Sequence, residues 1–166
     1  MTALAPRLFP VAEGKTSDEW YTPKSLFDQL DIEFDLDPAS SPPELSAVPA
    51  RRFYTVEDDG LALPWEGRVW LNPPYSKPSP WVDRFLGHGH GIALLPATST
   101  GRWVDKMWQV CDGVVLCRPF AFTRGDDTVA SMAPFRSILW AMGGECVEAI
   151  SSVGPVRSIH HSSTQT

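Results

Sequence analysis

The sequence predicts an α/β fold with a mostly parallel sheet and an antiparallel hairpin near its C-terminus. Short apolar segments with strand periodicity alternate with helical segments, which is typical of parallel strands joined by crossover helices. Two late strand-like segments are separated by a polar loop without a helix, which indicates an antiparallel pair. The 166 residues, 43% of them hydrophobic, suit one domain with a core of its own.

The elements expected in the first half are short. Thr22-Pro23 predicts a helix start, with Thr22 as N-cap and proline in the first helical position. Residues 32–36 alternate like a strand that stops at Asp37-Pro38, and residues 39–50 are rich in Ser and Pro, as loops are. A short strand at Phe53-Tyr54 and an acidic turn at 57–60 follow.

The second half has clearer periodicity. A strand at 68–71 ends in Asn72-Pro73-Pro74-Tyr75, and Ser79-Pro80 begins a helix that Gly87 ends. A continuous apolar strand at 92–95 precedes a helix capped by Thr100. The remaining expected strands are 114–117, 120–122 and 137–142, of which the last two form the hairpin around the polar loop 123–133.

The two ends of the chain lack a regular pattern. We expect a flexible tail at 1–17, one domain at 18–157 and a disordered tail at 158–166. No apolar run approaches the ~20 residues of a membrane-spanning helix, and the first ten residues lack the apolar core of a secretory signal. Three widely spaced cysteines indicate buried thiols in a reducing cytoplasm rather than a disulfide framework.

Charge is unevenly divided along the chain. The net charge of −6 argues against a generally basic surface for nucleic acid. Residues 1–83 hold seven Lys/Arg and fourteen Asp/Glu, whereas residues 84–166 hold seven and six. An acidic half that faces a small cationic ligand fits this division, and so does a solvated acidic surface.

Asn72-Pro73-Pro74-Tyr75 carries the strongest chemical signal. Two prolines directly after a strand end its ladder, because they lack N–H donors and have fixed φ. The rigid turn would hold the Asn72 side chain, the Pro73 carbonyl and the Tyr75 ring together, beyond the carboxyl end of a strand, where such sheets bind ligands. Two acceptors beside a ring suit a planar group that bears an NH₂; the alternative is a tight turn that anchors a tyrosine.

In this region the sequence resembles a known family. Asn-Pro-Pro-Tyr is the catalytic motif of S-adenosylmethionine-dependent amino methyltransferases. Four ordered segments look like those of the phage Dam-type DNA N6-adenine methyltransferases: 20–23, 34–39, 58–61 with Trp65, and 70–75 with Trp81. The resemblance runs from about Asp18 to Met142 and implies a Rossmann-like methyltransferase fold and a phage or prophage origin. Only 20 residues separate Asp37 from Asp58, too few for two crossovers of roughly a dozen residues each, so we expect a reduced fold with a trimmed sheet.

The resemblance implies that Asn72, Pro73, Pro74 and Tyr75 are catalytic. Asn72 Oδ1 and the Pro73 carbonyl would accept the two amine hydrogens of adenine, which frees the nitrogen lone pair, and Tyr75 would stack on the base. Positioning and fixed dipoles would then supply the rate without a strong general base. The adenine must leave the DNA helix to reach such a site.

For the donor, S-adenosylmethionine, the resemblance implies a site around the Thr-Pro and Asp-Pro elements. Its expected residues are Trp20, Thr22, Pro23, Asp37, Pro38, Ala39, Asp58 and Asp59. The glycine-rich turn of most methyltransferases is absent after Asp37-Pro38, and which carboxylate meets the ribose stays open. A solvated acidic turn is the alternative for Asp58 and Asp59.

On the DNA side, Phe120 and Phe122 are candidates for a second stacking face, and strand packing is the alternative. The candidates for phosphate contact are Arg118, Arg124 and Arg136. We expect no metal, because the histidines His88, His90, His160 and His161 have no Cys or acidic partner at ligand spacing.

These expectations combine into a site-specific DNA adenine-N6 methyltransferase that acts on a flipped adenine, in the host cytoplasm if a phage encodes it. Three alternatives stay open: methylation of cytosine N4, methylation of a protein glutamine, and a catalytically inactive module that keeps the cofactor cleft.

Overall fold

The computed structural model describes residues 20–97, 100–122 and 131–159. The tail expected at 1–17, most of the tail expected at 158–166, and Arg124 lie outside the described residues. Ser158 and Ile159, which the sequence assigns to the C-terminal tail, lie in and directly after the last strand. The proposed domain boundaries otherwise stay predictions.

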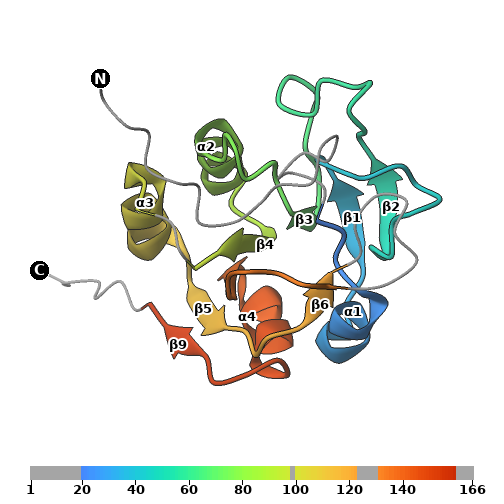
Figure 1. The fold of residues 1–166 in the computed structure, drawn as a ribbon. Helices are drawn as coiled ribbons and strands as arrows, with labels where there is room; N and C mark the ends of the chain where they lie inside the picture. The colour runs from blue at the N-terminus through green and yellow to red at the C-terminus, as the bar shows by residue number, and fades with distance from the viewer. Residues whose placement is uncertain (1–19, 98–99, 123–130, 160–166) are drawn as a thin grey trace, which may run out of the picture.

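Within the described residues a seven-stranded sheet forms the centre of the molecule, in the order β2-β1-β3-β4-β8-β5-β9 (Figure 1). Strands β1 to β4 pair in parallel, whereas β8 is antiparallel to both of its neighbours and β9 is antiparallel to β5. The sheet is therefore mixed, and the expectation of a mostly parallel sheet is wrong. The strands are β1 (Phe34–Asp37), β2 (Ala50–Phe53), β3 (Val69–Leu71), β4 (Gly91–Pro96), β5 (Gly113–Leu116), β8 (Ser137–Met142) and β9 (Arg157–Ser158).

The expected C-terminal hairpin is wrong in its partners. Strand β6 (Ala121–Phe122) pairs with β7 (Ser131–Met132) in a separate two-stranded sheet. Strand β8 instead inserts between β4 and β5, where Leu94 faces Leu139 and Val114 faces Trp140. The physical reason is burial: nearly every residue of β8 is buried, and a strand that is apolar on both faces needs cover above, below and along both edges.

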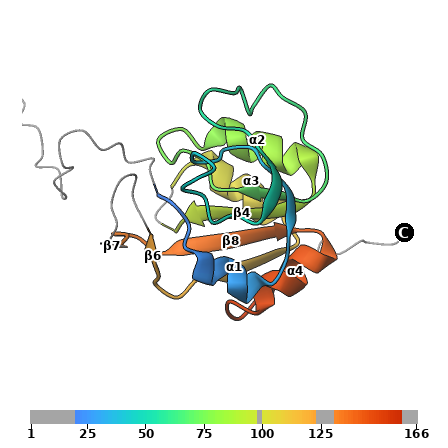
Figure 2. The same cartoon turned by 90° about the vertical axis from the view of Figure 1, so that its right-hand side faces the viewer.

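Four helices in the described part of the chain cover the two faces of the sheet (Figure 2). Helices α2 (Ser79–His88) and α3 (Arg102–Val110) lie on one face, and α1 (Lys24–Leu30) and α4 (Gly144–Ser151) lie on the other. The sequence analysis missed α4, a two-turn helix that buries only Cys146 and Ile150. None of these helices, among the described residues, has the length and apolarity needed to cross a membrane.

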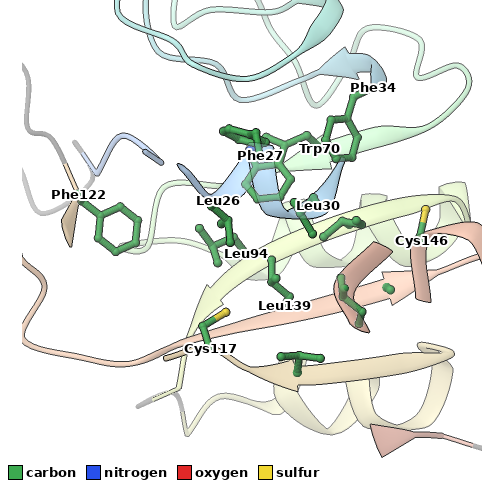
Figure 3. Packing of buried hydrophobic residues seen from close by; sticks show 14 of the residues in the cluster. Leu26, Phe27, Leu30, Phe34, Trp70, Leu94, Cys117, Phe122, Leu139 and Cys146 are labelled. Carbon is green, nitrogen blue, oxygen red and sulfur yellow. The ribbon is translucent and has the colours of Figure 1, made fainter. Parts of the chain in front are cut away.

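The core has two parts, one on each face of the sheet, and successive residues of a strand pack into different parts. Val69 and Leu71 of β3 pack towards α2 and α3, whereas Trp70 between them packs towards α1, as the two-residue period of a strand requires. Figure 3 shows Trp70 beside Phe27 and Phe34, and its ring centroid lies 4.8 Å from that of Phe27. This three-residue strand is anchored on both faces, so the residues that follow it start from a fixed position.

The region between β1 and β3 is short: it contains the strand β2 and no helix, so the crossover helices are absent here although the sheet has seven strands. The loop 38–49 joins β1 to the edge strand β2, and the loop 54–68 joins β2 to β3, both without a helix. Tyr54 N–H donates to the Asp37 carbonyl, and Ser40 N–H donates to the Tyr54 carbonyl, each at 2.9 Å. The two loops are therefore tied together at the carboxyl end of β1.

Candidate functional site

A cavity of about 590 Å³ opens at the carboxyl ends of β1 and β3. The volume lies within the 300–1,000 Å³ that is typical of small-molecule sites. Its wall combines segments far apart in sequence, namely 20–22, 37–42, 46–48, 55–56 and 58–60, together with Trp70, Asn72, Pro74 and Trp81. Seven of the eight residues expected to bind the donor line this cavity; Pro23 does not.

Asn72 is the first residue after β3 and lines the cavity. Its side-chain amide has one defined orientation. Nδ2 donates to the Trp20 carbonyl at 2.8 Å and lies 3.4 Å from Thr22 Oγ1. A carbonyl oxygen only accepts hydrogen bonds, so the NH₂ must be the side of the amide that faces Trp20. No residue in the described part of the chain donates to Asn72 Oδ1, which leaves an acceptor for a group in the cavity.

Pro73 and Pro74 differ in their position relative to the cavity. Pro74 lines the cavity, whereas Pro73 is buried and lies outside the lining. Among the described residues no backbone N–H donates to the Pro73 carbonyl, while the Pro74 carbonyl accepts from Lys77 N–H at 3.3 Å. The corner thus keeps a second unused acceptor next to Asn72.

Tyr75 is half-buried and does not line the cavity. Its hydroxyl lies 3.5 Å from the Leu94 carbonyl, and its ring packs edge-on against Phe135 at 5.6 Å. Burial raises the pKa of the phenol, so the side chain stays neutral at any working pH. Tyr75 therefore offers a ring, not a proton acceptor.

Asp37 is the buried charge-bearing group of the cavity. Its side chain is 3% exposed and accepts from Ala39 N–H at 3.2 Å. Desolvation raises the pKa of this carboxyl from 3.8 to about 7, and the hydrogen bonds from Ala39 and Ser40 only partly oppose that shift. A cation in the cavity would favour the ionised form.

The acidic turn on the opposite wall is exposed. Asp58 accepts from Thr55 N–H at 2.8 Å, and Asp59 accepts from Ala62 N–H at 3.2 Å. Gly60 fixes the distance between this turn and the Asp37 turn, because a Cβ at Gly60 would lie 2.0 Å from the Pro38 carbonyl oxygen. Only a glycine allows the two turns to touch here.

Comparison with known proteins adds to this geometry. A sequence profile described as DNA N-6-adenine-methyltransferase (Dam) matches residues 12–140, more than three quarters of the chain. The chain belongs to the Dam family. The expected family membership is thereby confirmed, and the matched region contains the whole wall of the cavity and Asn72–Tyr75.

Two similar phage proteins carry the name DNA N-6-adenine-methyltransferase. The one from Haemophilus phage HP1 (strain HP1c1) is 33% identical over 98 residues, which cover 53% of this chain and 55% of the relative. The one from Escherichia phage T1 is 36% identical over 101 residues, which cover 55% of this chain and 41% of the relative. The chain therefore spans about half the length of the curated relatives it matches.

A cluster of aromatic side chains lies beside Tyr75. The Trp20 ring meets Phe122 and Phe135 edge-on, at 5.6 and 5.5 Å. Phe122 is fully buried, so it packs in the core, as expected if it serves strand packing and not DNA. Phe120 is half-buried, and its ring centroid lies 4.8 Å from that of Phe122. Sequence reasoning missed Phe135, which directly follows Pro134 and has no periodic apolar neighbours.

The remaining predicted residues lie away from the cavity. Pro23, not Thr22, is the N-cap residue of α1, so the expected helix start is wrong by one residue. Arg118 is exposed beyond β5. Arg136 donates through Nε and Nη2 to the Cys117 carbonyl, at 3.2 and 2.7 Å, and thus supports the main chain.

Three potential metal ligands meet at the opposite end of β4, where His90, Glu145 and Cys146 place their donor atoms within 4.8 Å of one another. Sequence spacing did not reveal this group, because Glu145 is 55 residues from His90. However, Arg68 Nη2 lies 2.7 Å from Glu145 Oε2, and His90 Nε2 lies 2.7 Å from Oε1. A guanidinium on the same carboxylate disfavours a metal cation.

Proposed function

We propose that this Dam-family protein transfers a methyl group from S-adenosylmethionine to N6 of adenine in DNA. The observation that carries the proposal is the Asn72 amide, whose NH₂ is engaged by Trp20 and whose Oδ1 is left as an acceptor at a cavity wall. The two phage relatives, which this chain matches over about half of their length, bear the name of that activity.

The corner after β3 suits an exocyclic amine. Asn72 Oδ1 and the Pro73 carbonyl are two neighbouring acceptors with no donor among the residues described. Acceptance of both amine hydrogens would draw the nitrogen lone pair out of conjugation with the ring and towards the methyl donor. Because these dipoles are already oriented, little reorganisation accompanies the reaction.

The cavity suits the donor in size and charge. When bound, the sulfonium of S-adenosylmethionine supplies the electrophilic methyl group. Asp37 would hold a cationic group of that ligand from the buried side, and Asp58 and Asp59 would face its polar groups from the rim. Trp20, Thr22, Pro38 and Ala39 would complete the wall.

The DNA side is less enclosed. The Tyr75 ring would stack on a flipped adenine, with Phe120 as a second ring nearby. Arg118 and Arg124 would meet phosphate oxygens. The half-buried Pro23, at the N-terminus of α1, would then act by holding the Trp20–Thr22 segment rather than by contact with the donor.

The test is methylation of mixed-sequence DNA with labelled S-adenosylmethionine, followed by digestion to nucleosides. We expect N6-methyladenine from the unaltered protein. Asn72→Ala should lower the transfer rate by about a hundredfold or more, the scale of a lost transition-state contact, with donor affinity retained.

Gln29→Ala is the matched control, since it removes an amide from the exposed face of α1. N4-methylcytosine or a methylated glutamine as the product would replace the adenine proposal with one of its alternatives. Donor binding in a calorimetric titration without any methylated product would favour the inactive module that keeps the cofactor cleft.

A further inference from the structure

We propose that the Trp20–Thr22 segment orients the amide of Asn72, so that Thr22 and the Trp20 main chain are positioning groups for catalysis. The inference deepens the proposed function, on which it rests. It also gives Thr22, which lines the donor cavity, a second task.

An asparagine amide is nearly symmetrical in shape, so packing alone does not choose between its two orientations. A 180° turn of the Asn72 amide would place Oδ1 opposite the Trp20 carbonyl and Thr22 Oγ1, where Nδ2 now lies at 2.8 and 3.4 Å. Oδ1 would then face the Trp20 carbonyl, which only accepts, and the N–H groups would face the substrate amine; the Thr22 hydroxyl, which can donate or accept, serves as an acceptor for Nδ2 in the observed orientation. The segment therefore selects the orientation in which Oδ1 is available.

Thr22 is free for this role because it does not cap α1. Residues of its type before a helix commonly bond to the N–H groups of the first turn. Here Pro23 takes the N-cap position, and α1 has no side-chain cap within the described residues. Thr22 is nevertheless 6% exposed, and its hydroxyl lies next to Asn72 Nδ2.

The segment is itself rigid enough to act as a support. The Trp20 side chain is 9% exposed and is held edge-on by Phe122 and Phe135. On its other side, Leu26 and Phe27 anchor α1 in the same core. Asn72 is thus aligned by groups 50 and 52 residues away in the chain.

The first test compares Thr22→Val, which removes the hydroxyl at nearly constant shape, with Thr22→Ser, which keeps it. We expect Thr22→Val to lower the single-turnover methylation rate about three- to tenfold, the effect of one lost hydrogen bond, with a smaller change in donor Kd and an unchanged Tm. Thr22→Ser should stay within about twofold of the unaltered protein. Equal rates in Val and Ser variants, or a loss of donor affinity without a loss of rate, would overturn the proposal.

A second test does not depend on activity. Asn72 is the only asparagine in the chain, so ¹⁵N labelling of asparagine and glutamine yields one asparagine side-chain NH₂ pair beside those of the glutamines. We expect these protons to exchange with water more slowly than the amide of the exposed Gln29, and Thr22→Val to accelerate the exchange. Exchange as fast as that of Gln29 would disprove the orientation, whether or not the protein methylates DNA. Slow exchange in a protein that methylates nothing would instead count against the proposed function alone.

Discussion

The turn of Asp37 and the turn of Asp58 and Asp59 both bring carboxylates to the cavity, and they differ in burial. Asp37 is buried at the end of β1 and has a pKa raised to about 7, whereas Asp58 and Asp59 are exposed on the opposite wall. Burial makes the charge of Asp37 conditional on what occupies the cavity. The exposed pair instead accepts hydrogen bonds from the main chain of its own turn.

The difference originates in the local sequence. Asp37 follows the buried residues of β1, and the next residue is a buried proline that cannot donate to it. Asp58 lies in a turn of four exposed residues, where Thr55 already supplies a main-chain donor. We therefore expect Asp37 to dominate donor binding and the exposed turn to modulate it.

Replacement of the buried carboxylate should have the largest effect. We expect Asp37→Asn to weaken S-adenosylmethionine binding by about 10- to 100-fold at pH 8, because a charged hydrogen-bonding partner of the donor is lost. Isothermal titration calorimetry measures the donor Kd of the variant and of the unaltered protein. An unchanged Kd would show that Asp37 does not bind the cationic group of the donor, and would contradict its larger role relative to Asp58 and Asp59.

The pH dependence provides the control for this variant. The carboxyl of Asp37 is protonated below about pH 7 in the free protein, so donor affinity should rise as pH passes from 6 to 8 and be flat in Asp37→Asn. Since the folded-state pKa is raised, the free protein should lose stability between about pH 4 and 7 and no further above that. A pH-independent Kd in the unaltered protein would contradict the shift.

Separation of the two turns should have an intermediate effect. Gly60→Ala places a methyl group 2.0 Å from the Pro38 carbonyl, so the turns must move apart, at a cost of about 1–3 kcal/mol. Thermal unfolding and donor Kd report the change. Gly87→Ala within α2 is the matched control: its Cβ meets nothing within 4 Å, and it should stabilise the helix by up to about 1 kcal/mol. Equal changes of Tm and donor Kd in the two variants would show that the close approach of Gly60 to the Pro38 carbonyl does not hold the two turns together.

The exposed turn should give the smallest effect. Asp58→Asn keeps the acceptor for Thr55 and removes a solvated charge, so we expect less than about a threefold change in donor Kd at moderate salt. The measurement is the same titration at low and high salt. A loss as large as that of Asp37→Asn would mean that Asp58, not Asp37, carries the specific contact.

The sequence predicted the local elements around the site well, because their signals are local. A strand that runs into two prolines, and the Thr-Pro and Asp-Pro turns, depend on φ restrictions that operate wherever the chain folds. The position of 137–142 depends instead on which open strand edge a buried segment reaches, and this is decided by tertiary packing. Sequence reasoning therefore found the strand and assigned it the wrong partner.

The site shows the same division. Seven donor-site candidates line one cavity, since the motifs sit at strand ends that the sheet brings together. The contact of Phe135 with Tyr75 and Trp20, and the hydrogen bond from Asn72 to Trp20, join residues 52 to 115 positions apart. Nothing in the spacing of a single sequence reveals such pairs.

The late arrival of β8 has a consequence for biosynthesis. Until residues 137–142 leave the ribosome, β4 has an open edge flanked by apolar side chains, and β5 has no strand between it and the rest of the sheet. Open apolar edges are sites of intermolecular association. Nascent chains that stall before residue 137 should therefore aggregate or recruit chaperones, whereas completion of β8 joins β5 to β4.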